Sequence, residues 1–248
     1  PHVRYLDEAL RHVRCSLALC PVQGRAYVYL AELCFLENSG EEGKTACIAQ
    51  AIRVRPFDGE VLYAGAREAL LAGDYDRWLT LARQSFQAGR RQQRRLITDL
   101  ISRTPPEGLE EMIQMVVREF QPDWTALRTL YFRAQQRGQP EQLVWLRRRC
   151  AEQAEADARL TRGEAAAELW NEARKFYAAN QEGDRAFECA KNAVASDPND
   201  FAARYGFGLA LLEQGQPEEA ESHLRWCLQR RPNDAAAEAK WKEAIRRR

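Results

Sequence analysis

A short motif recurs at a fixed interval near the C-terminus of this 248-residue chain. Pro-Asn-Asp stands at 198–200 and again at 232–234, so the two motifs are 34 residues apart. Proline lacks a backbone donor and restricts the preceding residue to extended geometry, so each motif predicts the end of a helix. The aspartate that follows is suited to cap the next helix. A stop and start signal repeated at this interval limits the fold to an array of helical units.

The residues between the motifs recur too, in the segments 167–200 and 201–234. Ala186 and Ala220 hold the same place in the two segments, where a small side chain lets two helices approach closely. Apolar residues recur around them at intervals of three and four, as they do on the buried face of a helix. Each segment therefore predicts a hairpin of two helices.

This pattern resembles the tetratricopeptide repeat, a unit of about 34 residues with Trp, Gly, Tyr, Ala and Pro at fixed places. Trp170, Tyr177 and Gly208 stand at the matching places in this chain. The resemblance implies an all-α fold, a right-handed superhelical solenoid of antiparallel helix hairpins. Large residues between hairpins are buried in such an array, so we expect Trp170 and Tyr177 to be buried.

The same spacing extends toward the N-terminus. Residues 5–21 predict the second helix of a hairpin, so the chain is expected to begin within a repeat. Six further repeats of varying quality follow, and a final helix is predicted from about Asn233 to Arg247. The array therefore accounts for the whole chain.

One irregularity predicts where the array divides. About eight extra residues lie near 151–163, in a segment without proline where Thr161 and Glu164 have the form of a capping box. We expect two elongated helices to meet there. The predicted domains are an N-terminal subarray of repeats at 1–160, and a C-terminal pair of repeats with its terminal helix at 161–248.

Composition argues against several classes of protein. A net charge of +1 gives no general attraction to nucleic acid, so no nucleic-acid partner is expected. No apolar run approaches the roughly 18 residues of a membrane helix, and this segment is not expected to insert into a membrane. Known catalytic motifs are absent, and the three histidines lack the spacing of metal ligands. We therefore expect no enzyme activity, no catalytic residue, no metal and no cofactor.

The cysteines and the N-terminus indicate a location. Seven cysteines form no Cys-x-x-Cys pair, and Cys47, Cys189 and Cys227 replace small apolar residues of the pattern, so we expect reduced thiols in the core. The chain starts at Pro1 without an initiator methionine or a signal-like stretch. The predicted location is cytoplasmic, with a membrane tether in a missing N-terminal region as an open possibility.

The resemblance also implies a binding surface. In the tetratricopeptide family, the inner faces of the first helices of the hairpins line a concave groove that binds extended peptides or partner helices. The matching positions supply seven candidate groove residues: Tyr63, Arg67, Arg128, Phe132, Asn171, Lys175 and Tyr205. Their basic members favour an acidic or carboxylate-bearing protein partner. The predicted function is a non-enzymatic scaffold for protein–protein interaction.

Two clusters of arginine form a second candidate surface, Arg90 to Arg95 and Arg147 to Arg149. Trp145 is near the second cluster, and exposed aromatic residues beside cations are typical of single-strand nucleic-acid binding. Acidic residues are interleaved with these arginines throughout the chain. Solvated helix faces are therefore the favoured interpretation.

A further resemblance concerns the protein to which this chain belongs. The stretch at Leu17–Leu36 is similar to soluble repeat tails of multi-pass O-antigen ligase or polymerase proteins of bacterial envelopes. The resemblance implies, as the alternative function, an accessory domain of a membrane-bound enzyme that assembles glycans.

Overall fold

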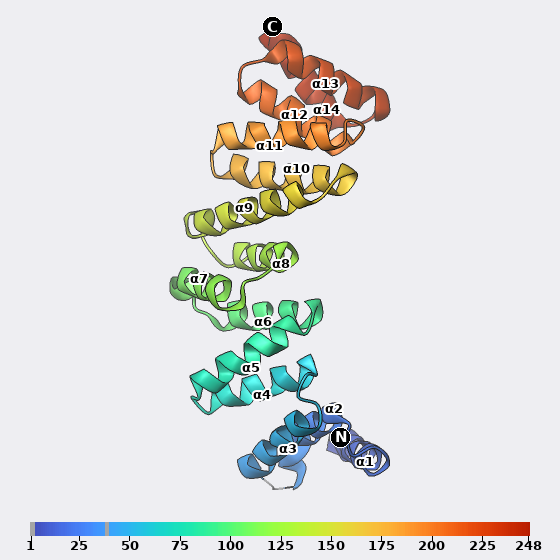
Figure 1. Cartoon of the computed structure of the whole chain (residues 1–248), viewed down its shortest axis with the longest axis vertical. Coiled ribbons are helices and arrows are strands. Elements are labelled where there is room, and N and C mark those ends of the chain that lie inside the picture. The colour runs from blue at the N-terminus through green and yellow to red at the C-terminus, as the bar shows by residue number, and fades with distance from the viewer. Residues whose placement is uncertain (1–2, 38–39) are drawn as a thin grey trace. The chain divides into compact units, whose positions relative to one another are not determined.

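The computed structural model of the chain describes residues 3–37 and 40–248, and these residues form fourteen α-helices and three short 3-10 turns without a β-strand (Figure 1). The helices are α1 (Val3–Leu19), α2 (Gly24–Leu33), α3 (Gly40–Val54), α4 (Gly59–Leu71), α5 (Tyr75–Gln87), α6 (Arg90–Arg103), α7 (Leu109–Phe120), α8 (Trp124–Gln135), α9 (Val144–Leu160), α10 (Gly163–Ala179), α11 (Gly183–Ser196), α12 (Phe201–Glu213), α13 (Pro217–Arg230) and α14 (Ala235–Arg247). The predicted all-α repeat fold is confirmed.

The order of the helices follows the predicted repeats. α1 precedes six successive pairs that run from α2 to α13, and α14 follows them. Five of these pairs pack as hairpins: α2 with α3, α4 with α5, α8 with α9, α10 with α11, and α12 with α13. Short loops between packed helices produce this antiparallel arrangement.

The chain divides into two compact units. The first comprises Pro1–Thr104 with Gln114–Gln121, and the second comprises Pro105–Ile113 with Pro122–Arg248. The division passes through α7. The elongated helices α9 and α10 are 17 residues each, as the extra residues near 151–163 predict, and both belong to the second unit. The division of the repeats at residue 160 stays a prediction.

The recurring Pro-Asn-Asp motif performs the predicted task. Pro198 lies between α11 and α12, and Pro232 lies between α13 and α14. Asp200 caps α12 by accepting a hydrogen bond from the amide of Ala203 at 2.6 Å. Asp234 caps α14 in the same way at 2.9 Å. Local chemistry alone therefore determines where these helices stop and start.

The capping box predicted at Thr161 and Glu164 is wrong. α10 begins after Arg162, which makes no side-chain capping bond. The hydroxyl of Thr161 instead donates to the backbone carbonyl of Asp157, in the last turn of α9. A threonine can bond to the carbonyl four residues before it, and the long helix α9 supplies that acceptor.

The turns inside the hairpins require left-handed backbone. Gly73 and Gly215 have φ angles of +76° and +71° at equivalent places after α4 and α12. Gln181 has a φ of +62° after α10, although it is not glycine. In all three turns the next amide donates back to a carbonyl five residues earlier, as in the helix-ending motif that glycine favours.

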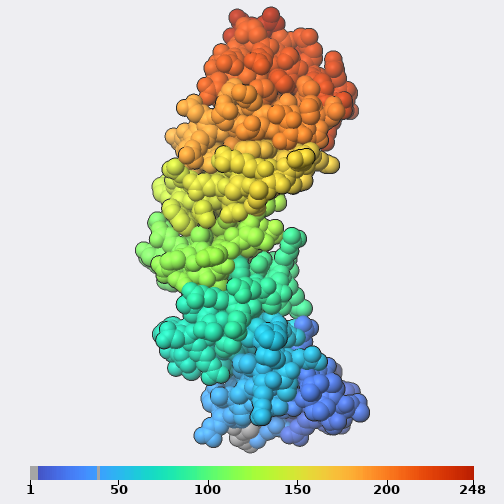
Figure 2. Space-filling model, viewed as in Figure 1, coloured from blue at the N-terminus to red at the C-terminus, as the bar shows by residue number. Residues whose placement is uncertain are grey.

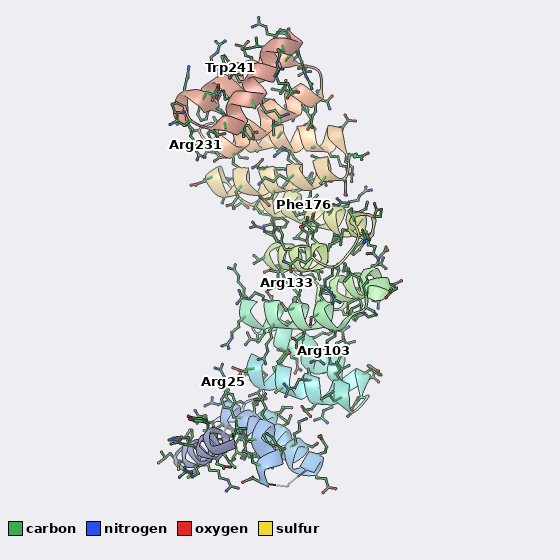
Figure 3. All side chains as sticks on the ribbon, turned by 180° about the vertical axis from the view of Figure 1, so that it is seen from behind. Arg25, Arg103, Arg133, Phe176, Arg231 and Trp241 are labelled. Atoms are coloured by element: carbon green, nitrogen blue, oxygen red, sulfur yellow. The ribbon has the colours of Figure 1, made fainter. Side chains whose placement is uncertain are left out.

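The core of the second unit contains the residues that the repeat pattern selects. Tyr177 is fully buried, Trp170 is 7% exposed and Ala186 is 1% exposed, which confirms the prediction for the two aromatic residues. The ring of Phe176, labelled in Figure 3, lies 5.9 Å from that of Trp124. Side chains of neighbouring helices meet in the space-filling view (orange to red in Figure 2). Small residues thus allow close helices, and large residues fill the space between them.

Burial separates the cysteines into reactive and protected groups. Burial raises the pKa of Cys150 and of Cys189 to about 12, and that of Cys227 to about 11, whereas Cys15 and Cys20 are exposed. The thiolate is the nucleophile. At pH 8 we expect a thiol reagent to modify Cys15 and Cys20 within minutes and the three buried thiols only after unfolding. Mass spectrometry of digested protein, with denatured protein as the control, checks this; rapid labelling of Cys150 would contradict it.

Candidate functional site

In the first unit, the predicted site residues lie on one face of α4. The helix begins after Asp58, whose carboxylate accepts hydrogen bonds from the amides of Glu60 at 2.9 Å and Val61 at 3.4 Å. Tyr63 and Arg67 are four residues apart, so they share one side of the helix. The cap therefore sets the start of a helix that presents both side chains together.

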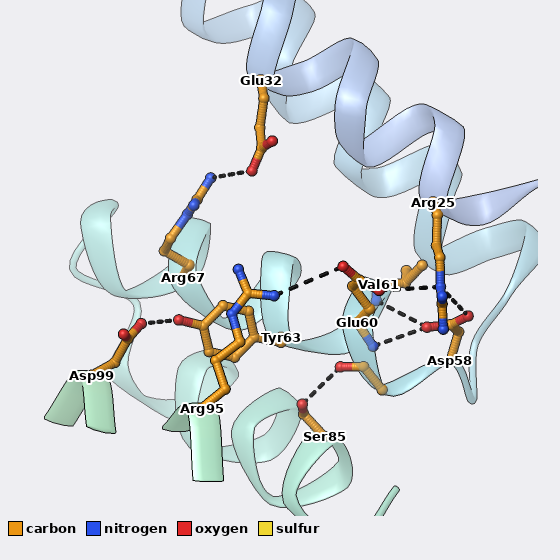
Figure 4. Close-up of polar contacts among 11 residues, drawn as sticks. Arg25, Glu32, Asp58, Glu60, Val61, Tyr63, Arg67, Ser85, Arg95 and Asp99 are labelled. Carbon is orange, nitrogen blue, oxygen red and sulfur yellow. Dashed lines mark hydrogen bonds and ion pairs between the residues drawn. The ribbon is translucent and has the colours of Figure 1, made fainter. Parts of the chain in front are cut away.

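Tyr63 makes two contacts with α6. Its ring is 6% exposed, and the Arg95 guanidinium lies 4.1 Å from the ring centroid. Its hydroxyl donates a hydrogen bond to Asp99, and Arg95 lies 3.9 Å from the Glu60 carboxylate (Figure 4). Tyr63 is thus more buried than a peptide-stacking residue would be, and it holds the Arg95 side chain at the surface.

Arg67 and Arg25 form ion pairs that connect consecutive repeats. Arg67 lies 3.5 Å from the Glu32 carboxylate on α2 and 3.6 Å from that of Glu68. Arg25 lies 3.2 Å from the carboxylate of Glu60 and also contacts the capping aspartate of α4 (Figure 4). The arginines of these pairs are partly exposed to solvent, so the pairs contribute little to stability.

Beside Arg67 is a shallow hollow of about 30 Å³, which we call the α4 hollow. Its lining residues are Tyr63, Ala66, Arg67, Leu70, Trp78, Leu96, Asp99, Leu100 and Arg103. Most of this lining is apolar, and Arg67 and Arg103 contribute two cations against one carboxylate. Within residues 3–37 and 40–248, no carboxylate oxygen lies within 4.0 Å of the Arg103 guanidinium. The hollow therefore combines an apolar lining with an arginine that makes no ion pair within the described residues, since the Asp99 carboxylate accepts from Tyr63.

Two larger hollows lie elsewhere, with volumes of about 520 and 500 Å³. In the first, Lys44 pairs with Glu68 at 2.7 Å. In the second, the Tyr177 hydroxyl donates to Glu155 at 2.9 Å; burial, and then the bond to this carboxylate, raises the pKa of Tyr177 to about 12. Carboxylates outnumber cations in the lining of both hollows, whereas in the α4 hollow cations outnumber carboxylates, so the α4 hollow is the better candidate for an acidic ligand.

In the second unit, three of the predicted site residues are exposed. Arg128 and Phe132 are neighbours on α8, with the guanidinium 5.6 Å from the ring centroid. Lys175 on α10 pairs with Glu172 at 2.6 Å. Arg128 and Phe132 together present a cation over an open aromatic ring, a combination that can hold a peptide.

The two other predicted residues of the second unit are largely enclosed. Asn171 is 6% exposed, and its side-chain oxygen accepts from Arg174 at 3.0 Å. A Cβ atom added to Gly206 would lie 2.7 Å from that oxygen, so α10 and α12 approach closely there. Tyr205 is half-buried and stacks on Phe201 at 6.3 Å between centroids, and burial raises its pKa. Asn171 thus serves the contact between helices.

The structure therefore distributes the seven predicted residues among three settings. Tyr63 and Arg67 share a face in the first unit, Arg128 and Phe132 share one in the second, and the remaining three lie on α10 and α12. A groove that runs continuously past all seven stays a prediction.

Sequence reasoning missed two charged residues of the α4 hollow, Asp99 and Arg103, and the neighbouring Arg95 that contacts Tyr63, all on α6. Arg95 was assigned to a solvated arginine cluster, and the other two were not selected. A signal was present, because the interacting residues Glu60 and Arg95 are 35 residues apart and Tyr63 and Asp99 are 36 apart. A search at the standard interval of 34 residues misses these pairs, because the partner residues on α6 lie one or two positions further along the chain.

Other kinds of site find no support in the part of the chain that the structure describes. It contains no group of three or more His, Cys, Asp or Glu side chains placed to hold a metal ion. It also contains no helix that combines the length and the apolar character needed to span a bilayer.

Residues 177–240 match the family described as the tetratricopeptide repeat. No curated protein matches the sequence. Among solved structures, the Naa15/Naa10 complex bound to HypK-THB is 12% identical with a TM-score of 0.48, and the match covers 98% of this chain but 37% of that one. YrrB, a tetratricopeptide-repeat protein with an unusual peptide-binding site, is 14% identical with a TM-score of 0.42, covering 93% and 97%. MamA from Desulfovibrio magneticus RS-1 is 15% identical with a TM-score of 0.40, covering 86% and 98%.

Proposed function

We propose that this chain, whose residues 177–240 are tetratricopeptide repeats, is a non-enzymatic scaffold that binds an extended segment of a partner protein. The observation that carries the proposal is the α4 hollow, where apolar side chains lie beside Arg67 and Arg103. Repeat arrays of helix pairs commonly present such surfaces to partners. A segment with one apolar residue next to carboxylates fits this chemistry.

The binding mode follows from the neighbours of the two arginines. An apolar side chain of the partner covers Leu70 and Trp78, the partly exposed apolar residues of the lining, and so removes water from their surface. A carboxylate of the partner then pairs with Arg103, and a second one replaces Glu32 beside Arg67. Each such bond contributes about 1.5–3 kcal/mol where water is excluded and much less at an exposed rim.

The second unit offers an additional contact of the same kind. Arg128 and Phe132 are exposed on α8, and their cation and ring suit an acidic residue followed by an apolar one. We propose that Lys175 and Tyr205 border this second surface, with Asn171 as its support.

The test is selection of peptides of about twelve residues on the whole chain, followed by affinity measurements with the best synthetic peptide. We expect enriched peptides to carry a leucine or phenylalanine flanked by aspartate or glutamate. The double variant Arg67→Glu/Arg103→Glu should weaken binding about tenfold or more, because each contact becomes repulsive. Arg128→Glu should weaken it to a smaller extent.

The matched control is Arg90→Glu/Arg91→Glu, which changes the net charge equally at the exposed start of α6. It should retain full affinity, and melting curves should show that every variant is folded. If the charge reversals disturb folding, Arg67→Gln/Arg103→Gln replaces them, because it removes both charges without adding carboxylates. It should also weaken peptide binding. If Arg67→Glu/Arg103→Glu and the control lost the same amount of peptide affinity, only net charge would matter, and the proposal would fail.

The alternative function, an accessory domain of a membrane-bound glycan-assembling enzyme, depends only on the resemblance at Leu17–Leu36. The full-length gene tests it, because such an enzyme has several apolar segments.

A further inference from the structure

A cluster of arginine and aromatic side chains lies in the C-terminal repeats, next to Tyr205. The guanidinium groups of Arg204 and Arg230 lie over the ring of Trp226, at 4.5 and 4.4 Å from its centroid. Arg204 also donates to the backbone carbonyl of Pro198 at 2.6 Å. These contacts hold two cations against one ring, one from the first turn of α12 and one from the last turn of α13.

A third arginine joins the cluster through another ring. The guanidinium of Arg231, labelled in Figure 3, lies 4.0 Å from the ring centroid of Phe201. That ring stacks on Tyr205 with an angle of 9° between the planes. We call Arg204, Arg230 and Arg231, with Trp226 and Phe201, the arginine–aromatic cluster. Aromatic contacts restrict the side-chain motion of all three arginines before any ligand arrives.

The three cations of this cluster are not neutralised by ion pairs. In residues 3–37 and 40–248, no carboxylate oxygen lies within 4.0 Å of any of the three guanidinium groups. Asp200 and Asp234 belong to the same turns, but each uses a side-chain oxygen to cap a helix by accepting from a backbone amide. By comparison, Arg225 on the same helix as Trp226 pairs with Glu221. The cluster therefore concentrates three cations, of which Arg204 also donates to a backbone carbonyl, without an ion pair to any carboxylate in the described part of the chain.

We propose that the arginine–aromatic cluster binds a short run of aspartate and glutamate residues in a partner protein. Guanidinium groups match carboxylates in geometry and charge. Successive acidic side chains of an extended segment can reach three cations that are spread over adjacent turns. Nucleic acid fits less well, because Trp226 is half-buried and already covered by two guanidinium groups, so a base would have to displace one of them.

This binding differs from that of the α4 hollow in its requirements. The cluster needs only negative charge, whereas the hollow also needs an apolar side chain. A peptide made only of acidic and glycine residues therefore reports on the cluster, and the proposal stands or falls independently of the proposed function.

The experiment measures fluorescence anisotropy of a labelled peptide with six consecutive acidic residues, titrated with the whole chain at low ionic strength. The triple variant Arg204→Gln/Arg230→Gln/Arg231→Gln should bind about tenfold or more weakly than the unchanged chain. Arg90→Gln/Arg91→Gln/Arg94→Gln is the matched control for net charge and should bind almost normally. Arg67→Gln/Arg103→Gln should also leave this peptide's affinity unchanged. Higher salt should weaken binding to the unchanged chain.

A second variant separates orientation from charge. Arg204→Lys/Arg230→Lys/Arg231→Lys keeps the three cations and leaves the core intact, so we expect an intermediate affinity. Three results would overturn the proposal: equal affinity for the triple glutamine variant and the unchanged chain, equal losses for that variant and its control, or tighter binding of a single-stranded oligonucleotide of the same charge. Circular dichroism of each variant verifies that it is folded.

Discussion

Replacing Ala186 by Trp is expected to lower the free energy of unfolding of the C-terminal repeats by about 3 kcal/mol or more. Ala186 is 1% exposed on α11, which packs against α10 along its length. A bulky ring at this enclosed place must push the two helices apart, because closely packed interiors tolerate little added volume. Urea unfolding followed by circular dichroism measures the change.

The control for this prediction is the same substitution at Ala195, which is exposed on the same helix. Ala195→Trp should change the free energy of unfolding by no more than about 0.5 kcal/mol. If the Ala186 variant were as stable as the Ala195 variant, the close approach of α10 and α11 at this position would be incorrect.

Replacing Phe120 by Ala is expected to destabilise the first unit by about 3–5 kcal/mol. The Phe120 ring at the end of α7 lies 5.2 Å from that of Phe86 and 6.5 Å from that of Trp78, measured between centroids. Truncation removes these contacts and leaves a cavity, since the two partner rings are on the rigid helix α5. Thermal unfolding monitored by circular dichroism checks the prediction.

Phe57 supplies the comparison, because it is 89% exposed in the loop before α4. Phe57→Ala removes the same atoms without opening a cavity and should leave the melting temperature almost unchanged. Similar melting temperatures for the two variants would show that the end of α7 does not pack on α5.

Much of the fold could be predicted from the sequence because its determinants are local. Pro198 and Pro232 stop helices, Asp200 and Asp234 start them, and a small residue such as Ala186 marks where helices approach. Each of these effects depends on residues within one or two turns of the chain. The number and order of helices, and the burial of the repeat residues, follow from a pattern that recurs in each unit.

Thr161 illustrates the limit of local reasoning. Its hydroxyl could accept from a free amide at the start of α10, or it could donate to a free carbonyl at the end of α9. Either bond satisfies one backbone group at a helix end. The outcome depends on how far α9 extends, which packing against neighbouring helices determines.

Only the tertiary structure determined the partners of the charged side chains. Arg67 and Glu32 are 35 residues apart, and Tyr63 and Asp99 are 36 apart, so a loop one or two residues longer than the standard repeat selects which side chains meet. Within the described residues, packing also leaves Arg103 without an ion pair, and inside the last hairpin it brings Arg204 of α12 onto the ring of Trp226 on α13. Sequence determined the helices and their buried faces, because periodic patterns and helix caps act over short distances. The candidate binding surfaces depend on contacts between repeats, and their geometry appears only when the repeats are packed.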